Sequence, residues 1–185
     1  MNTNKIFVAL FLALSFVSCK NEETKKSEEI KNSEEGKAKV SNLFTFTLNV
    51  TVKQDDDFQL FYKEESGPEI PFEEAKSVWS GVKGSETAQD IVFSLPEGVL
   101  PTQLRLDFGQ NKKQPEIIVN NFKASYNDKS FSISGKDFFN YFIPDENFVK
   151  IDKEAQKVIP VTGTAYDPMF FSTADYNTEM TKLAK

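Results

Sequence analysis

The chain contains no histidine, and this absence excludes more chemistry than any other feature of its composition. Without imidazole, Ser-His-Asp catalysis, Cys-His catalysis and every histidine-ligated metal site are excluded. The spacings of glycine-rich phosphate loops, dinucleotide fingerprints and calcium-binding loops do not occur either. A hydrolase of this composition would have to use paired carboxylates, as many glycosidases do. We expect neither a cofactor nor a catalytic residue in this chain.

Positive charge is scarce outside one segment. Arg105 is the only arginine, the formal net charge is −6, and no basic stripe occurs outside the mixed-charge residues 20–39. Nucleic-acid binding depends on clusters of lysine and arginine that neutralise phosphates. We therefore expect no nucleic-acid partner.

Cysteine occurs once, at Cys19, so the chain cannot form an internal disulfide. It follows a basic N-terminus, residues 1–5, and the apolar run 6–17, which is the order of an export signal. This run is shorter than the roughly 20 apolar residues that a transmembrane helix needs. We therefore predict a signal peptide over residues 1–18.

Residues 14–19, Leu-Ser-Phe-Val-Ser-Cys, resemble the lipobox of bacterial lipoproteins. The small residue Ser18 precedes the cysteine as in that family, whereas Phe16 stands where the family usually has an aliphatic residue. The resemblance implies cleavage before Cys19 and attachment there of three acyl chains, such as palmitate. Two or more chains hold a protein stably at a membrane. The alternative is a free thiol that happens to follow a signal peptide.

The segment 20–39 consists almost entirely of Lys, Glu, Asn and Ser, with Ile30 as its one large apolar residue. It cannot bury enough apolar area to offset a backbone ordering cost of roughly 1 to 2 kcal/mol per residue. We predict that residues 19–39 are a lipidated cysteine and a disordered tether, with a solvated helix as the alternative. Residues 20–23, Lys-Asn-Glu-Glu, resemble the signal that directs some Gram-negative lipoproteins to the outer leaflet. This resemblance implies an outer-membrane protein facing the cell surface, with a periplasm-facing protein as the alternative.

From residue 40 to residue 171 the composition changes to aromatic and β-branched residues that alternate with polar ones. The clearest case is 44–52, where Phe44, Phe46 and Leu48 alternate with threonine and asparagine. Such alternation predicts strands with one buried face and one wet face, which are typical of antiparallel sheets. The further predicted strands are 58–62, 77–82, 90–95, 103–108, 116–126 and a strand around 131–133.

Seven or more short strands predict an all-β fold, an antiparallel β-sandwich of jelly-roll or Ig-like type. One or two short helices are expected, at 136–143 before Pro144 and at 72–76. Asn127 and Asp128 predict a hairpin turn. We expect the sandwich domain to span 40–171 and 172–185 to be a loose C-terminal tail, although residues 169–171 could close the sandwich.

The run Asp55, Asp56 and Asp57 has two interpretations. Several carboxylate oxygens could hold calcium, but adjacent side chains on an extended chain point apart. A hairpin tip is therefore the favoured interpretation, and we predict no metal site. The other acidic residues, among them Glu73, Glu74 and Asp107, stand mostly in turn-like contexts where solvated carboxylates are ordinary.

Trp79, Tyr62 and Tyr126 are the candidate ligand-binding residues, because aromatic rings on sugar-binding sandwiches stack against the apolar face of a pyranose. The alternative is that they belong to the core, since large aromatic side chains favour burial.

Three segments resemble small β-sandwich modules of carbohydrate-binding-like architecture, namely 57–62 (Asp-Phe-Gln-Leu-Phe-Tyr), 82–85 (Val-Lys-Gly-Ser) and 104–109 (Leu-Arg-Leu-Asp-Phe-Gly). Such modules occur in bacterial surface lipoproteins. We expect a lipid-anchored, non-catalytic module that binds a glycan or a protein partner of the envelope. The alternatives are a structural accessory subunit of an envelope complex and a carboxylate-based glycan-active enzyme.

Overall fold

The computed structural model describes residues 42–67, 69–163 and 165–185, all of which lie in one compact unit. The predicted signal peptide, the acylation at Cys19 and the predicted tether fall outside the described residues.

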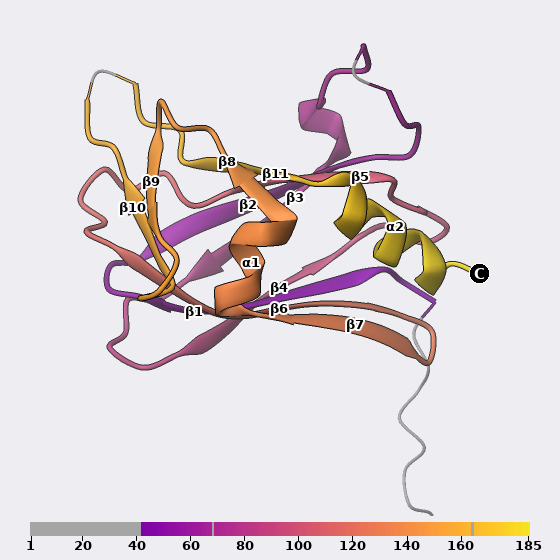
Figure 1. Ribbon diagram of the computed structural model, residues 1–185, viewed down its shortest axis with the longest axis horizontal. Helices are drawn as coiled ribbons and strands as arrows, with labels where there is room; N and C mark the ends of the chain where they lie inside the picture. Colours follow the sequence, from indigo (N-terminus) through magenta and orange to yellow (C-terminus); the bar gives the residue numbers. More distant parts are fainter. Residues whose placement is uncertain (1–41, 68, 164) are drawn as a thin grey trace, which may run out of the picture. The chain divides into compact units, whose positions relative to one another are not determined.

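Two antiparallel sheets face each other as the layers of a β-sandwich (Figure 1). Sheet A has the order β4 (Gln89–Ser94), β1 (Thr45–Val52), β6 (Ile117–Tyr126), β10 (Lys157–Pro160) and β9 (Val149–Asp152), and β7 (Lys129–Ser134) also pairs with β6. Sheet B has the order β3 (Ser77–Val82), β2 (Asp56–Lys63), β5 (Gln103–Asp107), β11 (Met169–Ser172) and β8 (Phe142–Pro144). The predicted all-β sandwich is confirmed.

In β1, alternation determines which face of the strand is buried. Along β1, Phe46, Leu48 and Val50 are fully buried, and the residues between them are half-buried. The predicted hairpin is also present, because Tyr126 pairs with Lys129 across a two-residue turn in which Asn127 has a φ of 53°. Asparagine tolerates this left-handed conformation better than most residues do, so the turn fixes the register of β6 and β7.

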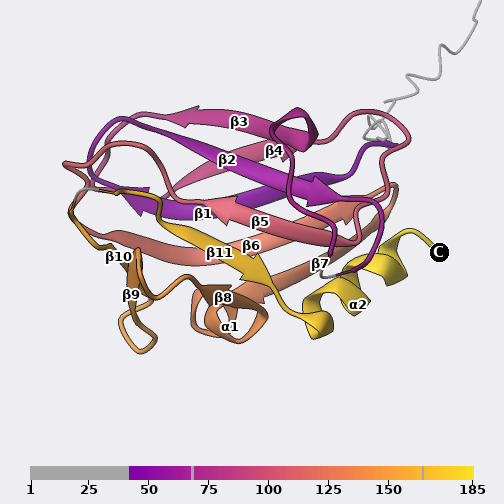
Figure 2. The same cartoon turned by 90° about the horizontal axis from the view of Figure 1, so that it is seen from above.

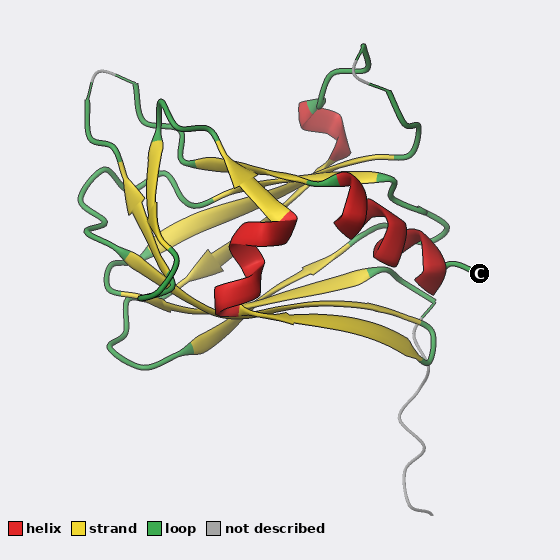
Figure 3. Ribbon diagram, viewed as in Figure 1, coloured by secondary structure: helices red, strands yellow, loops and turns green. Residues whose placement is uncertain are grey.

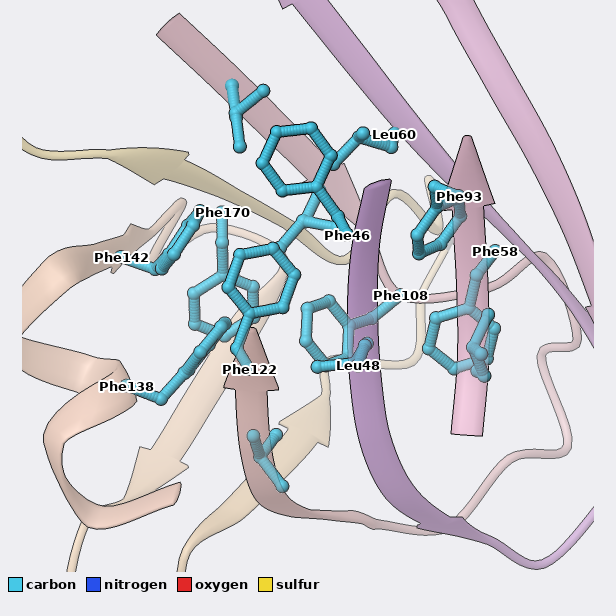
Figure 4. Packing of buried hydrophobic residues seen from close by; sticks show 14 of the residues in the cluster. Phe46, Leu48, Phe58, Leu60, Phe93, Phe108, Phe122, Phe138, Phe142 and Phe170 are labelled. Atoms are coloured by element: carbon cyan, nitrogen blue, oxygen red, sulfur yellow. The ribbon is translucent and has the colours of Figure 1, made fainter. Parts of the chain in front are cut away.

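Phenylalanine fills the space between the two sheets (Figure 4). Phe108, which directly follows β5, and Phe170 of β11 have ring centres 4.9 Å apart. Phe122 of β6 reaches Phe142 of β8 at 5.1 Å, and Phe138 stacks on Phe142 at 4.7 Å. Such pairs contribute about 0.5 to 1.5 kcal/mol each beyond their buried area. These contacts join sheet A, sheet B and a helix into one core.

That helix is α1 (Gly135–Tyr141), and it is shorter than the predicted 136–143. Ser134 caps it, since its hydroxyl accepts a hydrogen bond from the Asp137 N–H at 3.2 Å. Phe142 leaves the helix because it pairs with Ser172 of β11, so Pro144 ends strand β8 rather than the helix. The second expected turn is present as η1 (Glu74–Lys76).

The C-terminal residues are a helix, and the predicted loose tail over 172–185 is wrong. Helix α2 (Ala174–Leu183) begins after Thr173, whose side chain accepts from the Tyr176 N–H at 3.3 Å. Tyr176, Met180 and Leu183 lie at i, i+4 and i+7, and all three are buried. Both helices lie along the same side of the sandwich (Figures 2 and 3). The domain therefore extends beyond residue 171 and includes α2.

In the part of the chain that the structure describes, no helix has the length and apolar character that crossing a membrane would require.

Candidate functional site: the Trp79 face of sheet B

The register of sheet B places polar residues and one tryptophan in a row on its outer side. Gln59 of β2 pairs with Trp79 of β3 on one side and with Asp107 of β5 on the other. Directly opposite residues in antiparallel strands project from the same face, so these three side chains lie next to one another. Their neighbours along β2, Phe58 and Leu60, project into the core and are fully buried.

A second row places the only arginine beside this first row. Phe61 of β2 pairs with Arg105 of β5, and the guanidinium carbon lies 4.5 Å from the centre of the Phe61 ring. The Nε and Nη2 groups of Arg105 donate to the two carboxylate oxygens of Asp107 at 2.7 and 2.6 Å. This two-bond geometry and the ring beneath the guanidinium hold the arginine in one orientation. Asp167 adds a carboxylate oxygen 3.6 Å from Arg105 Nη2.

Glu74 of η1 determines how Trp79 is presented. Its Oε1 accepts from Gln59 Nε2 at 2.7 Å and from the Trp79 indole Nε1 at 3.3 Å. Gln59 Nε2 also donates to the Ser77 hydroxyl at 2.8 Å, and the Gln59 residue is only 3% exposed. Trp79 itself is 45% exposed. The indole therefore has a fixed N–H edge and an open surface.

Residues 69–76 cover the neighbouring part of the same sheet face. Phe72 contacts Phe61 and Phe171, with ring centres 6.5 and 6.0 Å apart, and the Lys63 ammonium lies 4.3 Å from the centre of the Phe72 ring. Phe61 and Lys63 are consequently buried although they point away from the core. Figure 1 shows this segment and its short helix on the outer side of sheet B. We use the name Trp79 face for the exposed Trp79 together with the polar residues around it, which are Glu74, Arg105, Asp107, Asp167 and the buried Gln59.

Burial and like charges affect the ionisation of the Trp79 face. Burial raises the pKa of Asp107 to about 6, and the nearby Asp167 and Glu74 carboxylates act in the same direction against the bonds from Arg105. Burial alone would lower the pKa of Arg105, but its bonds to Asp107 raise it, so the guanidinium stays charged. The face thus holds three carboxyl groups and one permanent cation.

Of the predicted ligand-binding residues, only Trp79 lies on this face. Tyr62 alternates with Phe61 on β2, points into the core and is 6% exposed. Tyr126, at the end of β6 in sheet A, stacks on Phe44 with ring centres 4.5 Å apart. The structure therefore does not bring these three aromatic residues together, and neither tyrosine offers an open ring beside Trp79.

Sequence reasoning did not select Gln59 and Arg105 as site residues. The signal that could have found them is the alternation itself, because it puts Gln59, Arg105 and Asp107 on the wet faces of two predicted strands. Glu74 lies outside the strands and reaches the site from η1. No strand pattern could have placed it there.

The Asp55, Asp56 and Asp57 run lies at a separate pocket of about 560 Å³. Asp55 accepts from the Lys83 ammonium at 2.7 Å and from the Gly84 N–H at 2.8 Å. Asp56 and Asp57 belong to β2 and not to the predicted turn, so one carboxylate turns inward and the next outward. Across the residues described, no group of three or more His, Cys, Asp or Glu side chains is arranged to hold a metal ion. The calcium interpretation therefore has no carboxylate cluster to support it.

The inward carboxylate, Asp56, serves the fold. Its Oδ1 accepts from the backbone N–H groups of Asp57, Gln110 and Asn111 at 2.9, 2.7 and 3.0 Å. Its Oδ2 accepts from Gln114 Nε2 at 3.2 Å. Asp56 thus holds the loop that follows β5.

Comparison with protein-family models, with curated proteins and with solved structures found no match to this chain.

Proposed function

We propose that this chain is a lipid-anchored lipoprotein of the bacterial cell envelope whose sandwich domain binds a glycan, without catalysis, at the Trp79 face. The observation that carries the proposal is the presentation of Trp79, which is 45% exposed while its N–H edge is bonded to Glu74. Binding sites on rigid strands hold their side chains more precisely than sites on loops. An open indole on a sheet, flanked by amide, guanidinium and carboxylate groups, matches the apolar face and hydroxyl rim of a sugar ring.

The anchor in this proposal is Cys19, and the location is the outer membrane, facing the cell surface, with the periplasm-facing orientation as second choice. The support is the signal-like segment 1–18, the lipobox resemblance and the acidic residues that follow. We expect the full chain to enter the detergent phase in a phase-separation assay and the Cys19→Ser variant to stay in the aqueous phase. Equal partitioning of both, or an unmodified thiol in the mass spectrum of the mature protein, would refute the anchor.

Glycan binding is tested by a glycan array with the full chain, solubilised in detergent. Replacing a buried interface tryptophan commonly costs more than about 1.4 kcal/mol, so Trp79→Ala should weaken binding at least tenfold. The matched control is Val92→Ala, because Val92 is also an exposed apolar residue, at 47%, but belongs to β4 in sheet A. Equal loss in both variants, or no binding to any glycan, would count against the Trp79 face.

Two other functions give distinct results in the same series. A structural accessory subunit would bind no glycan and would co-purify with a fixed envelope complex independently of Trp79. A carboxylate-based enzyme is favoured by one observation, the raised pKa of Asp107 beside two further acids. It would turn over an envelope polysaccharide, and the Asp107→Asn variant would abolish that turnover.

A further inference from the structure

We infer that the glycan taken by the Trp79 face carries protonated amino groups, as hexosamine units without N-acetylation do. The inference rests on the proposed function and names the chemical class of its ligand. It follows from the charged groups of the Trp79 face, from the hydrogen bonds and ion pairs that these groups already form, and from the distance between Trp79 and Asp107 across the sheet.

The charges of the Trp79 face do not balance. Arg105 contributes the one positive group, and Glu74, Asp107 and Asp167 contribute three negative ones. Asp167 and Glu74 act on both Arg105 and Asp107, so the four groups share one electrostatic site. The face therefore has a formal excess of two negative charges when all of its carboxyl groups are ionised.

The cations nearby do not cancel this excess. Arg105 already uses two N–H groups on Asp107. Lys63 is 7% exposed and lies against the Phe72 ring, and Lys76 pairs with Glu64 at 3.7 Å. Among the described residues, no ion pair is formed by Glu74, whose Oε1 accepts only from a neutral amide and an indole. A cation supplied by a ligand would complete the charge balance.

The geometry favours a sugar as the carrier of that cation. Trp79 and Asp107 stand in one row on strands two positions apart, and neighbouring strands are about 4.8 Å apart, so the row spans about 10 Å. This span is comparable with the length of a disaccharide lying across the strands. A pyranose stacked on the indole would place its ring substituents near Glu74, because Glu74 is bonded to the edge of that indole. An ammonium substituent meets a carboxylate there, an N-acetyl group brings no charge, and a uronic acid is repelled.

Titration of the full chain with oligosaccharides of equal length tests the inference. The probes are hexamers of glucosamine, of N-acetylglucosamine and of galacturonic acid, with hexalysine as a cationic peptide. We expect the glucosamine hexamer to bind at least tenfold more tightly than its acetylated counterpart. That preference should decrease with added salt and should disappear in Trp79→Ala.

Charge variants supply the matched controls. Glu74→Gln and Asp167→Asn each remove one negative charge, and Glu74→Gln keeps an oxygen that can accept from Gln59 and Trp79. Both variants should reduce the preference for the amino sugar by several-fold. Asp128→Asn removes an exposed carboxylate in the β6–β7 turn and should leave the preference unchanged.

The outcomes separate this inference from the function on which it rests. Binding of the acetylated and amino hexamers with equal affinity would overturn the inference and leave glycan binding intact. Failure of all three sugars would overturn the inference, and only the absence of binding to every glycan on the array would overturn the proposed function as well. Hexalysine could also bind as tightly as the glucosamine hexamer, with an affinity that Trp79→Ala does not change. That result would identify a surface that binds a basic protein by charge alone, and it would overturn the inference.

Discussion

The Asp55–Asp57 run offers the sharpest test of the structure, because three identical neighbours are assigned different roles. Asp56 is 8% exposed and accepts four hydrogen bonds, three from backbone N–H groups and one from Gln114. Asp57, the next residue, points outward and is exposed. Replacing Asp56 by alanine removes the acceptor of all four of these bonds, whereas replacing Asp57 removes a solvated carboxylate.

The size of the effect follows from these bonds. Taking about 1 kcal/mol for each of the four bonds gives a loss of about 4 kcal/mol in the free energy of unfolding for Asp56→Ala. Water can replace the carboxylate at the N–H groups of Gln110 and Asn111, which lie nearer the surface, so we expect about 3 kcal/mol. Asp56→Asn keeps the Oδ1 acceptor, but its new amide N–H₂ group would face the Gln114 Nε2 donor and could not accept from it. This substitution should lower the free energy of unfolding by about 1 to 2 kcal/mol.

Urea unfolding followed by tryptophan fluorescence measures these losses as shifts in the midpoint at constant slope. Asp57→Ala is the control and should stay within about 0.5 kcal/mol of the wild type, as surface substitutions usually do. Equal midpoints for Asp56→Ala and Asp57→Ala would show that the loop does not depend on this carboxylate, and would refute the assignment.

Three further predictions concern the core, a turn and the Trp79 face. Phe138→Ala should lower the free energy of unfolding by about 3 to 5 kcal/mol in the same urea assay, because the Phe138 ring contacts rings from both sheets. A loss under about 1 kcal/mol would contradict that packing. Gly109→Ala should lower the melting temperature by several degrees, because Gly109 has a φ of 94° and an added Cβ would overlap the Asp56 carboxylate. An unchanged melting temperature would argue against this backbone conformation. An NMR titration should give the Asp107 carboxyl a midpoint of about 6, and Arg105→Gln should raise it further; a midpoint near 3.8 would refute its burial. Because this pKa is raised in the folded state, the contribution of Asp107 to stability is complete below the unfolded value of 3.8 and is lost as the pH rises through about 6.

The strands of the first half of the domain could be predicted because their two faces differ in polarity. The observed bounds of β1 and β3 agree with the predicted ranges to within one residue. β1 alternates regularly between buried and half-buried positions, and β3 contains the strong strand formers Val78 and Trp79. The short strands β9 and β10 were not predicted, because four residues each give too few alternations for a period to be visible. Helix α2 was missed although its signal was present, namely the Thr173 cap followed by buried residues at helical spacing.

The site was less predictable than the fold for a physical reason. Trp79 could be singled out by residue type. Its exposure, however, depends on residues 69–76, which cover the part of the sheet beside Trp79 and leave Trp79 itself uncovered. The same segment buries Phe61 and Lys63, which the alternating pattern alone would leave exposed. Which half of a sheet face stays open is set by tertiary contacts of a loop, and local periodicity carries no information about them.

The pairing of Arg105 with Asp107 argues that the open half has a role beyond solvation. A half-buried ion pair seldom stabilises a fold as well as apolar residues of similar volume would. Here the pKa of Asp107 is raised to about 6 despite two hydrogen bonds from Arg105, because burial and the carboxylates of Asp167 and Glu74 oppose its charge. The grouping of three acids around one arginine beside an exposed tryptophan is consistent with the proposed binding role. Unfavourable ionisation of this kind is concentrated at functional sites. A ligand that brings positive charge would stabilise the ionised form of Asp107.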